Sequence, residues 1–77
     1  MISYNKLWKL LIDKNINKTQ LIDKANISTN AMAKLGKNEP VHLDVIIRIC
    51  EALECQIEDI VEIKTEKEME NEYNEGN

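Results

Sequence analysis

Phenylalanine is absent from this sequence, and glycine and proline are rare, with two glycines and one proline among 77 residues. Because these two residues dominate turns, their scarcity argues against long irregular loops and favours short helices that follow one another closely. Only two tyrosines and one tryptophan supply aromatic rings, so aliphatic side chains must build the core. A chain of this length forms one small domain. We expect an all-α fold, a compact five-helix bundle.

Groups typical of catalysis, metal binding and membrane insertion are also scarce. His42 is the only histidine, and no serine or cysteine has a base partner at a recognised spacing, so we expect neither an enzyme nor a cofactor. Cys50 and Cys55 match neither a disulfide framework nor a zinc pattern, and we expect them to be reduced and buried. There is no apolar run of about 18 residues and no signal-peptide pattern, so we expect no membrane span and a cytoplasmic location.

The charge of the chain is unevenly distributed. The net charge of −4 argues at first against a nucleic-acid partner. However, residues 1–38 carry seven lysines against two acids, a net charge of +5, whereas residues 39–77 have a net charge of −9. Because salt screens charges over roughly 8–10 Å, a polyanion responds to the face nearest to it. The basic half therefore indicates a surface that meets phosphate, with an ordinary mixed surface as the alternative.

Apolar side chains recur at helical spacing in five segments. They predict helices over residues 4–14, 17–25, 29–35, 43–53 and 57–62. Ser3 and Ser28 are expected N-caps of the first and third helices, and Asn17 is expected to form a capping box with Gln20. The fourth helix has so wide an apolar arc that we expect it to be enclosed by the bundle or by a partner subunit.

The joints between the second, third and fourth helices follow from single residues. Asn26 tolerates the left-handed conformation and is expected to make the turn before the third helix, with Ile27 as the apolar plug. Gly36 is expected to end the third helix. From Lys64 onward the sequence is polar and acid-rich, and we expect residues 64–77 to be a disordered tail, with a helical extension as the alternative.

Two short helices joined by a three-residue turn form a helix–turn–helix unit, whose second helix fits the major groove of DNA. The stretches LWKLLIDKNINKTQL, ISTNAMAKL and RICEALECQIEDIVEI together resemble the Cro/C1-type (XRE) helix–turn–helix regulators, of the short single-domain kind found in Gram-positive bacteria. The likeness is closest to regulators of chromosomal and mobile operons, including vancomycin-resistance clusters. It implies a lambda-repressor-like DNA-binding domain over residues 1–63. Ile22, Asn26 and His42 depart from the family, which usually has a small residue, glycine and a Ser or Thr cap there.

The resemblance also implies which side chains meet DNA. Base contacts fall on the outward face of the third helix, first on Thr29, Asn30 and Lys34 and second on Ser28 and Ala33. The implied phosphate contacts are Asn17, Lys18, Lys37 and Asn38. Asn17 is more readily explained as a helix cap and Trp8 as a packing residue. For Lys34, the alternatives to a base contact are a phosphate contact and plain solvation.

The family implies a homodimer on two-fold symmetric double-stranded DNA. The implied dimer interface is made by Ile57, Ile60, Val61 and Ile63, with closure of the monomer core as the alternative. The function expected from these features is an autoregulating repressor with no small-molecule ligand. The alternative is an antitoxin-type protein-interaction module that wraps its partner with the acidic tail.

Overall fold

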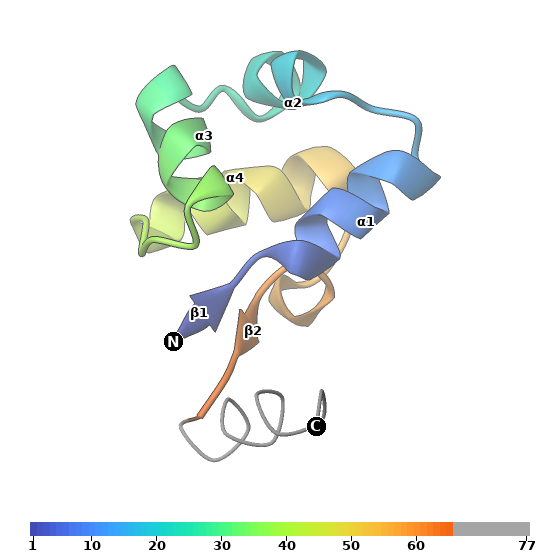
Figure 1. Ribbon diagram of the computed structural model, residues 1–77. Helices are drawn as coiled ribbons and strands as arrows, with labels where there is room; N and C mark the ends of the chain where they lie inside the picture. Colours follow the sequence, from blue (N-terminus) through green and yellow to red (C-terminus); the bar gives the residue numbers. More distant parts are fainter. Residues whose placement is uncertain (66–77) are drawn as a thin grey trace.

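The computed structural model describes residues 1–65, which form four α-helices, one 3₁₀ turn and a small two-stranded sheet (Figure 1). The elements in chain order are β1 (Ile2–Ser3), α1 (Asn5–Asp13), α2 (Lys18–Ala25), α3 (Thr29–Gly36), α4 (Leu43–Leu53), η1 (Ile57–Asp59) and β2 (Glu62–Ile63). In Figure 1, α4 runs through the middle, with α2 and α3 above it and the sheet below. The first four predicted helices are confirmed, with ends that shift by at most one residue.

Side chains at the helix starts explain where α2 and α3 begin. The Asn17 Oδ1 accepts the Gln20 N–H at 2.7 Å, and the Gln20 Oε1 accepts the Asn17 N–H at 2.8 Å, so the predicted capping box is confirmed. The Ser28 Oγ accepts the Ala31 N–H at 3.0 Å, which confirms that cap. His42 precedes α4 without a side-chain cap, as its departure from the family pattern suggests.

The start of α1 differs from the prediction. Ser3 belongs to β1, and the residue that caps α1 is Tyr4, which makes no side-chain cap bond. The Ser3 Oγ still accepts the Asn5 N–H, at 3.3 Å. The chain is extended at Ser3 because this residue pairs with Glu62 of β2, and the helix therefore begins later.

Non-glycine residues in the left-handed conformation end the helices. Asn26 has φ 54° and ψ 49°, which confirms the predicted turn. Asn15, Asn38 and Glu54 also have positive φ, at 57°, 56° and 53°. The helix α3 ends at Gly36, as expected, and Asn38 takes the left-handed conformation two residues later.

A single apolar core joins all four helices to the C-terminal segment. Its buried hydrophobic residues are Tyr4, Leu7, Leu11, Leu21, Ala25, Ile27, Ala31, Met32, Leu35, Ile46, Ile49, Leu53 and Ile60. The helix α2 packs chiefly on α4, and α1 packs on η1. Ile22 of α2 lies half-buried against this core, and in α3 Ala31 is buried, whereas Ala33 is exposed. The core thus holds α2 and α3 on the scaffold of α4.

The fifth predicted helix is wrong. Residues 57–59 form one 3₁₀ turn, in which the Asp59 carboxylate accepts the Gln56 N–H at 2.9 Å, and the chain then becomes extended. The extension is stabilised because Ile63 pairs with Ile2 in an antiparallel ladder. Lys64, the first residue of the expected tail, donates its N–H to the Met1 carbonyl at 2.8 Å.

The rest of the expected tail, residues 66–77, lies outside the described residues. Within residues 1–65, the helices are too short and too polar to cross a membrane.

Candidate nucleic-acid interface

The joint between α2 and α3 is fixed by backbone and side-chain contacts. The left-handed Asn26 reverses the chain, and the buried Ile27 donates its N–H to the Ile22 carbonyl at 3.2 Å. From α4, the Arg48 Nη1 donates to the Asn26 carbonyl at 2.9 Å, and its Nε pairs with Asp44 at 2.8 Å. These bonds tie the turn to the scaffold helix, so α3 has a defined direction relative to α2.

The helix α3 has one buried side and one exposed side. Ala31, Met32 and Leu35 face the core. All five residues that the sequence assigns to base contact are exposed on the other side: Ser28, Thr29, Asn30, Ala33 and Lys34. Ser28 also caps α3 through its Oγ, so its side chain has a structural role as well. The structure brings the five residues together on one open helix face.

The residues expected to contact phosphate lie at the start of α2 and just after α3. Asn17, Lys18 and Lys37 are exposed, and Asn38 is half-buried. Both polar ends of the Asn17–Gln20 box are engaged within the box, so capping is the structural role of Asn17. The Asn38 Oδ1 accepts the Tyr4 N–H at 3.1 Å, so Asn38 anchors the chain after α3. Lys18 and Lys37 are the two charged members of this set, and neither pairs with a carboxylate among residues 1–65.

Two residues that hold this surface in place were not identified from the sequence. Besides the bond at its N–H, Tyr4 donates its hydroxyl to the Glu39 carbonyl at 2.8 Å. Tyr4 therefore fixes the segment that follows α3 from both of its polar ends. Arg48 reaches the α2–α3 turn from α4. The sequence shows both residues at helical positions, but contacts between residues 22 to 35 positions apart leave no local signal.

The arrangement suits contact with double-stranded DNA. An α-helix with an exposed side fits the major groove, where an amide can bond bidentately to adenine and an ammonium can donate to guanine. Lys34 belongs to this exposed side, and Lys18 and Lys37 add positive charge at the start of α2 and at the end of α3. Among the described residues, none of these lysines forms an ion pair. Their charges are therefore available to phosphate.

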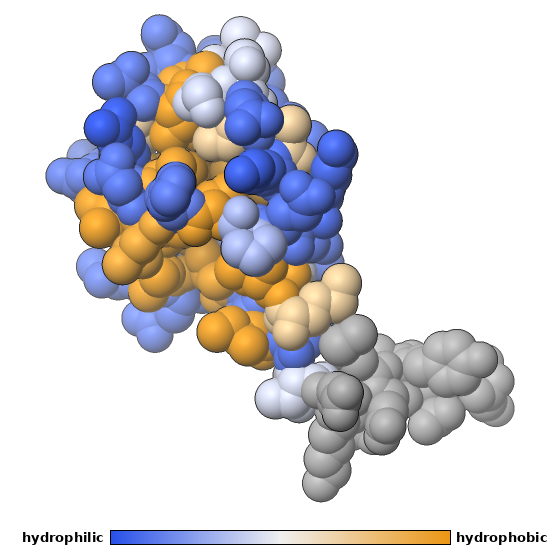
Figure 2. All heavy atoms as spheres, turned by 90° about the vertical axis from the view of Figure 1, so that its left-hand side faces the viewer, coloured by the Kyte–Doolittle hydropathy of each residue, from blue (hydrophilic) through white to orange (hydrophobic). Residues whose placement is uncertain are grey.

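A second surface is apolar. Figure 2 shows orange side chains gathered on the face that looks to the left in Figure 1, bordered by hydrophilic residues. Leu43 and Ile47 of α4, with Ile57 and Ile63 nearer the C-terminus, are large apolar residues that remain exposed, Leu43 at 62% and Ile63 at 73%. We call these four residues the apolar face. The wide arc of α4 is thus only partly enclosed by the chain itself.

The four residues expected at a dimer interface separate into two groups. Ile57 and Ile63 are exposed and Val61 is half-buried. Ile60 is fully buried against the core of the monomer, which favours the alternative of core closure for this residue. The sequence pattern could not separate the buried from the exposed isoleucines, because the 3₁₀ turn directs Ile60 inward while Ile57 stays exposed.

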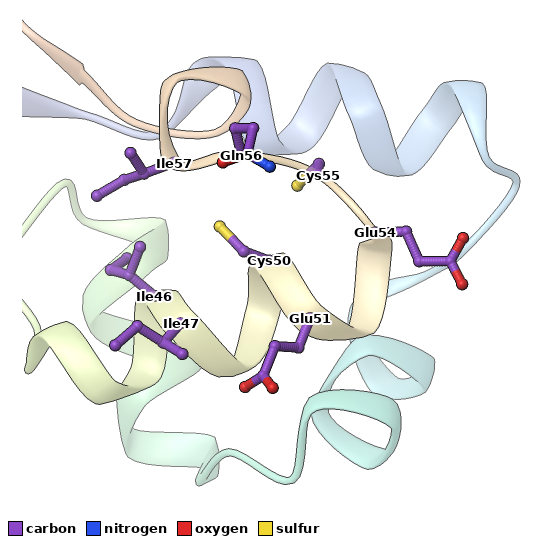
Figure 3. Close-up of a pocket in the computed structure, with 8 residues that line it drawn as sticks. All are labelled: Ile46, Ile47, Cys50, Glu51, Glu54, Cys55, Gln56 and Ile57. Atoms are coloured by element: carbon purple, nitrogen blue, oxygen red, sulfur yellow. The ribbon is translucent and has the colours of Figure 1, made fainter.

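A groove of about 300 Å³ opens between α4 and η1 on this side (Figure 3). Ile46, Ile47 and Ile57 line it, together with the free thiols of Cys50 and Cys55. The two cysteines are half-buried rather than buried as expected, and within the described residues both are free thiols. Burial is the largest cause that raises the pKa of both thiols, that of Cys55 to about 11. Both thiols are therefore protonated near neutral pH.

Comparison with known proteins identifies the family. Residues 6–66 match the model of the Cro/C1-type HTH DNA-binding domain. Among solved structures, the chain is similar to "Crystal structure of transcriptional regulator VanUg, Form II", with 51% sequence identity and a TM-score of 0.80 over 84% of this chain and 87% of that chain. No curated protein matches. Because this match covers most of the chain, the chain belongs to the Cro/C1-type helix–turn–helix DNA-binding family.

Proposed function

We propose that this protein is a transcription regulator that inserts α3 into the major groove of double-stranded DNA. The observation that carries the proposal is the exposure of all five outward residues of α3 on a helix held by the Asn26 turn and by the Tyr4 contacts. A rigid helix with an open polar side can read base edges without first being ordered. The similar solved structure carries the description of a transcriptional regulator, which supports the same role here.

Within this proposal, the exposed side chains have different tasks. Asn30 bonds to adenine, Lys34 donates to guanine, and Thr29 contacts a thymine methyl, with Ser28 and Ala33 close to the same bases. Lys18 and Lys37 bind phosphates on either side of the groove and set the position of α3. Asn17 and Asn38 support these lysines chiefly through their own structural bonds.

A single domain reads few base pairs, so we propose a homodimer on a palindromic operator with half-sites roughly 34 Å apart. The apolar face of Leu43, Ile47, Ile57 and Ile63 supports this assembly, because exposed apolar patches mark contact surfaces. Val61 is half-buried against the core, and Ile60 lies within it. Because α3 is assigned to DNA and the apolar face to the second subunit, these roles need no small-molecule ligand, and autoregulated repression is the simplest regulatory outcome.

The decisive experiment measures DNA affinity as a function of salt. Fragments bound by the purified protein are first selected from the host genome, and affinity for the selected site is then compared with that for a scrambled site. Asn30→Ala should weaken binding to the selected site by about 1–3 kcal/mol and relax the base preference at one base pair. Lys37→Ala should weaken both sites alike and reduce the salt slope by about one.

Lys6→Ala is a matched control, because the Lys6 Nζ contacts the Glu58 carbonyl at 3.2 Å on the η1 side of the molecule. It removes one positive charge without touching α3 and should leave the preference between the two sites unchanged. Equal losses on both sites from Asn30→Ala and Lys37→Ala would refute the role of α3. Co-purification of a small basic protein, with no binding to DNA, would favour the antitoxin-type module.

A further inference from the structure

Lys18 occupies an unusual position for a lysine at the start of a helix. Its Nζ lies 4.6 Å from the centroid of the Trp8 ring, although the two residues belong to different helices, α2 and α1. Trp8 is half-buried, with its other contacts in the core, whereas Lys18 is exposed. An ammonium at this distance is attracted by the negative face of the indole ring.

The partner of this lysine is an aromatic ring and not a carboxylate. Among residues 1–65, the one salt bridge joins Arg48 and Asp44, and Lys18 has no acidic partner. A carboxylate would neutralise the ammonium and compete with an incoming phosphate. An indole face orders the same ammonium and leaves its full charge, with its outward N–H groups free for a second partner.

Ordering matters because a lysine side chain is among the most flexible of all side chains. Immobilising such a chain when a complex forms opposes binding, and a side chain that is already held avoids this penalty. The capping box fixes the backbone of Lys18 at the first turn of α2, and the Trp8 ring fixes the far end of the side chain. Both ends of the side chain are therefore set before any ligand arrives.

We propose that Trp8 is a positioning residue for DNA binding, whose indole face holds the Lys18 ammonium ready to receive a backbone phosphate at the start of α2. This inference rests on the proposed function, since it concerns the same DNA surface. Trp8 itself touches no base and no phosphate, and acts only through Lys18. A leucine could fill the core side of this position but could not hold the ammonium.

The test is a double-mutant cycle with four proteins: the wild type, Trp8→Leu, Lys18→Met and the double variant. All are measured on the selected site below their melting temperatures. Trp8→Leu should weaken binding about two- to five-fold and leave the salt slope unchanged, because Lys18 still reaches the phosphate in the complex. Lys18→Met should reduce the slope by about one, and adding Trp8→Leu to it should cause no further loss. Trp8→Phe, which keeps an aromatic face, should recover part of the affinity.

A second readout examines the contact without DNA. The methylene protons of Lys18 next to Nζ should be shifted upfield by the ring in the NMR spectrum of the wild type, and the shift should vanish in Trp8→Leu. A loss from Trp8→Leu that is equal with and without Lys18 would show that Trp8 only supports the fold, and would overturn the inference. An absent ring shift would overturn it too. If the wild type does not bind DNA, the proposed function is refuted together with this inference. The two outcomes above refute the inference alone, so the two kinds of failure can be told apart.

Discussion

Replacing Glu54 by glycine should stabilise the protein, because Glu54 ends α4 in a conformation that suits glycine. Glu54 has φ 53° and ψ 51°, the left-handed region. The next residue completes the motif, since the Cys55 N–H bonds to the Cys50 carbonyl at 3.0 Å. This pattern is the Schellman motif, in which glycine is the usual left-handed residue.

The size of the effect follows from two opposing contributions. A residue with a Cβ in the left-handed region costs roughly 1–2 kcal/mol, which glycine avoids. Glycine loses more backbone entropy on folding, roughly 0.5–1 kcal/mol. Glu54→Gly should therefore raise the free energy of unfolding by about 0.5–1 kcal/mol through the backbone. For a domain of this size, the melting temperature should rise by about 2–8 °C.

Glu54→Ala is the matched control for the charge. A carboxylate at the C-terminal end of a helix is unfavourable, and both variants remove it. Alanine keeps the Cβ, so the difference between the two variants isolates the backbone contribution. Unfolding in urea, monitored by circular dichroism at 222 nm, gives both free energies. If Glu54→Ala is as stable as Glu54→Gly, the left-handed residue carries no strain and the reasoning fails.

Two further predictions concern the contact of Tyr4 with the segment after α3 and the groove beside α4. Tyr4→Phe removes the hydroxyl that donates to the Glu39 carbonyl at 2.8 Å, and should lower the free energy of unfolding by about 0.5–1.5 kcal/mol in urea titrations; an unchanged value would show that water replaces this bond fully. Because the thiolate is the reactive form and burial raises the pKa of Cys55 to about 11, alkylation of Cys55 by iodoacetamide, followed by mass spectrometry, should be slow at neutral pH and should accelerate up to about pH 11. The folded protein binds the Cys55 thiol proton more tightly than the unfolded chain does, where the thiol has its ordinary pKa of 9.0. The contribution of this proton to stability should therefore be complete below pH 9 and lost as the pH rises toward 11. A Cys55 alkylation rate that levels off near pH 9 would contradict the raised pKa.

Local patterns predicted the helix–turn–helix unit well. The Asn17–Gln20 capping box, the Ser28 cap and the left-handed Asn26 all involve residues within a few positions of one another, where sequence reports directly on geometry. The outward face of α3 follows from helical periodicity in the same way. The family resemblance added the functional roles of those residues.

Contacts between distant segments explain what the sequence could not predict. The pairing of Ile2 with Ile63 turns the expected fifth helix into a 3₁₀ turn followed by a strand, and two-residue strands have no detectable periodicity. The same pairing moves Ser3 out of its expected role as a cap. Glu54 gave no sign of a left-handed conformation, because that conformation follows from the way α4 meets η1. Ile60 lies in the core because the 3₁₀ turn before it directs its side chain inward.

The short ladder between β1 and β2 also decides where both ends of the domain emerge. The Met1 ammonium donates to the Lys64 carbonyl at 3.0 Å, so the chain enters and leaves the domain at one point. That point lies below α4 in Figure 1, while α2 and α3 lie above it. A fluorophore or an immobilising linker attached ahead of Met1 would thus hang from the rear of the molecule. Surface-tethered binding experiments can use that attachment and leave α3, the proposed recognition helix, facing the solution.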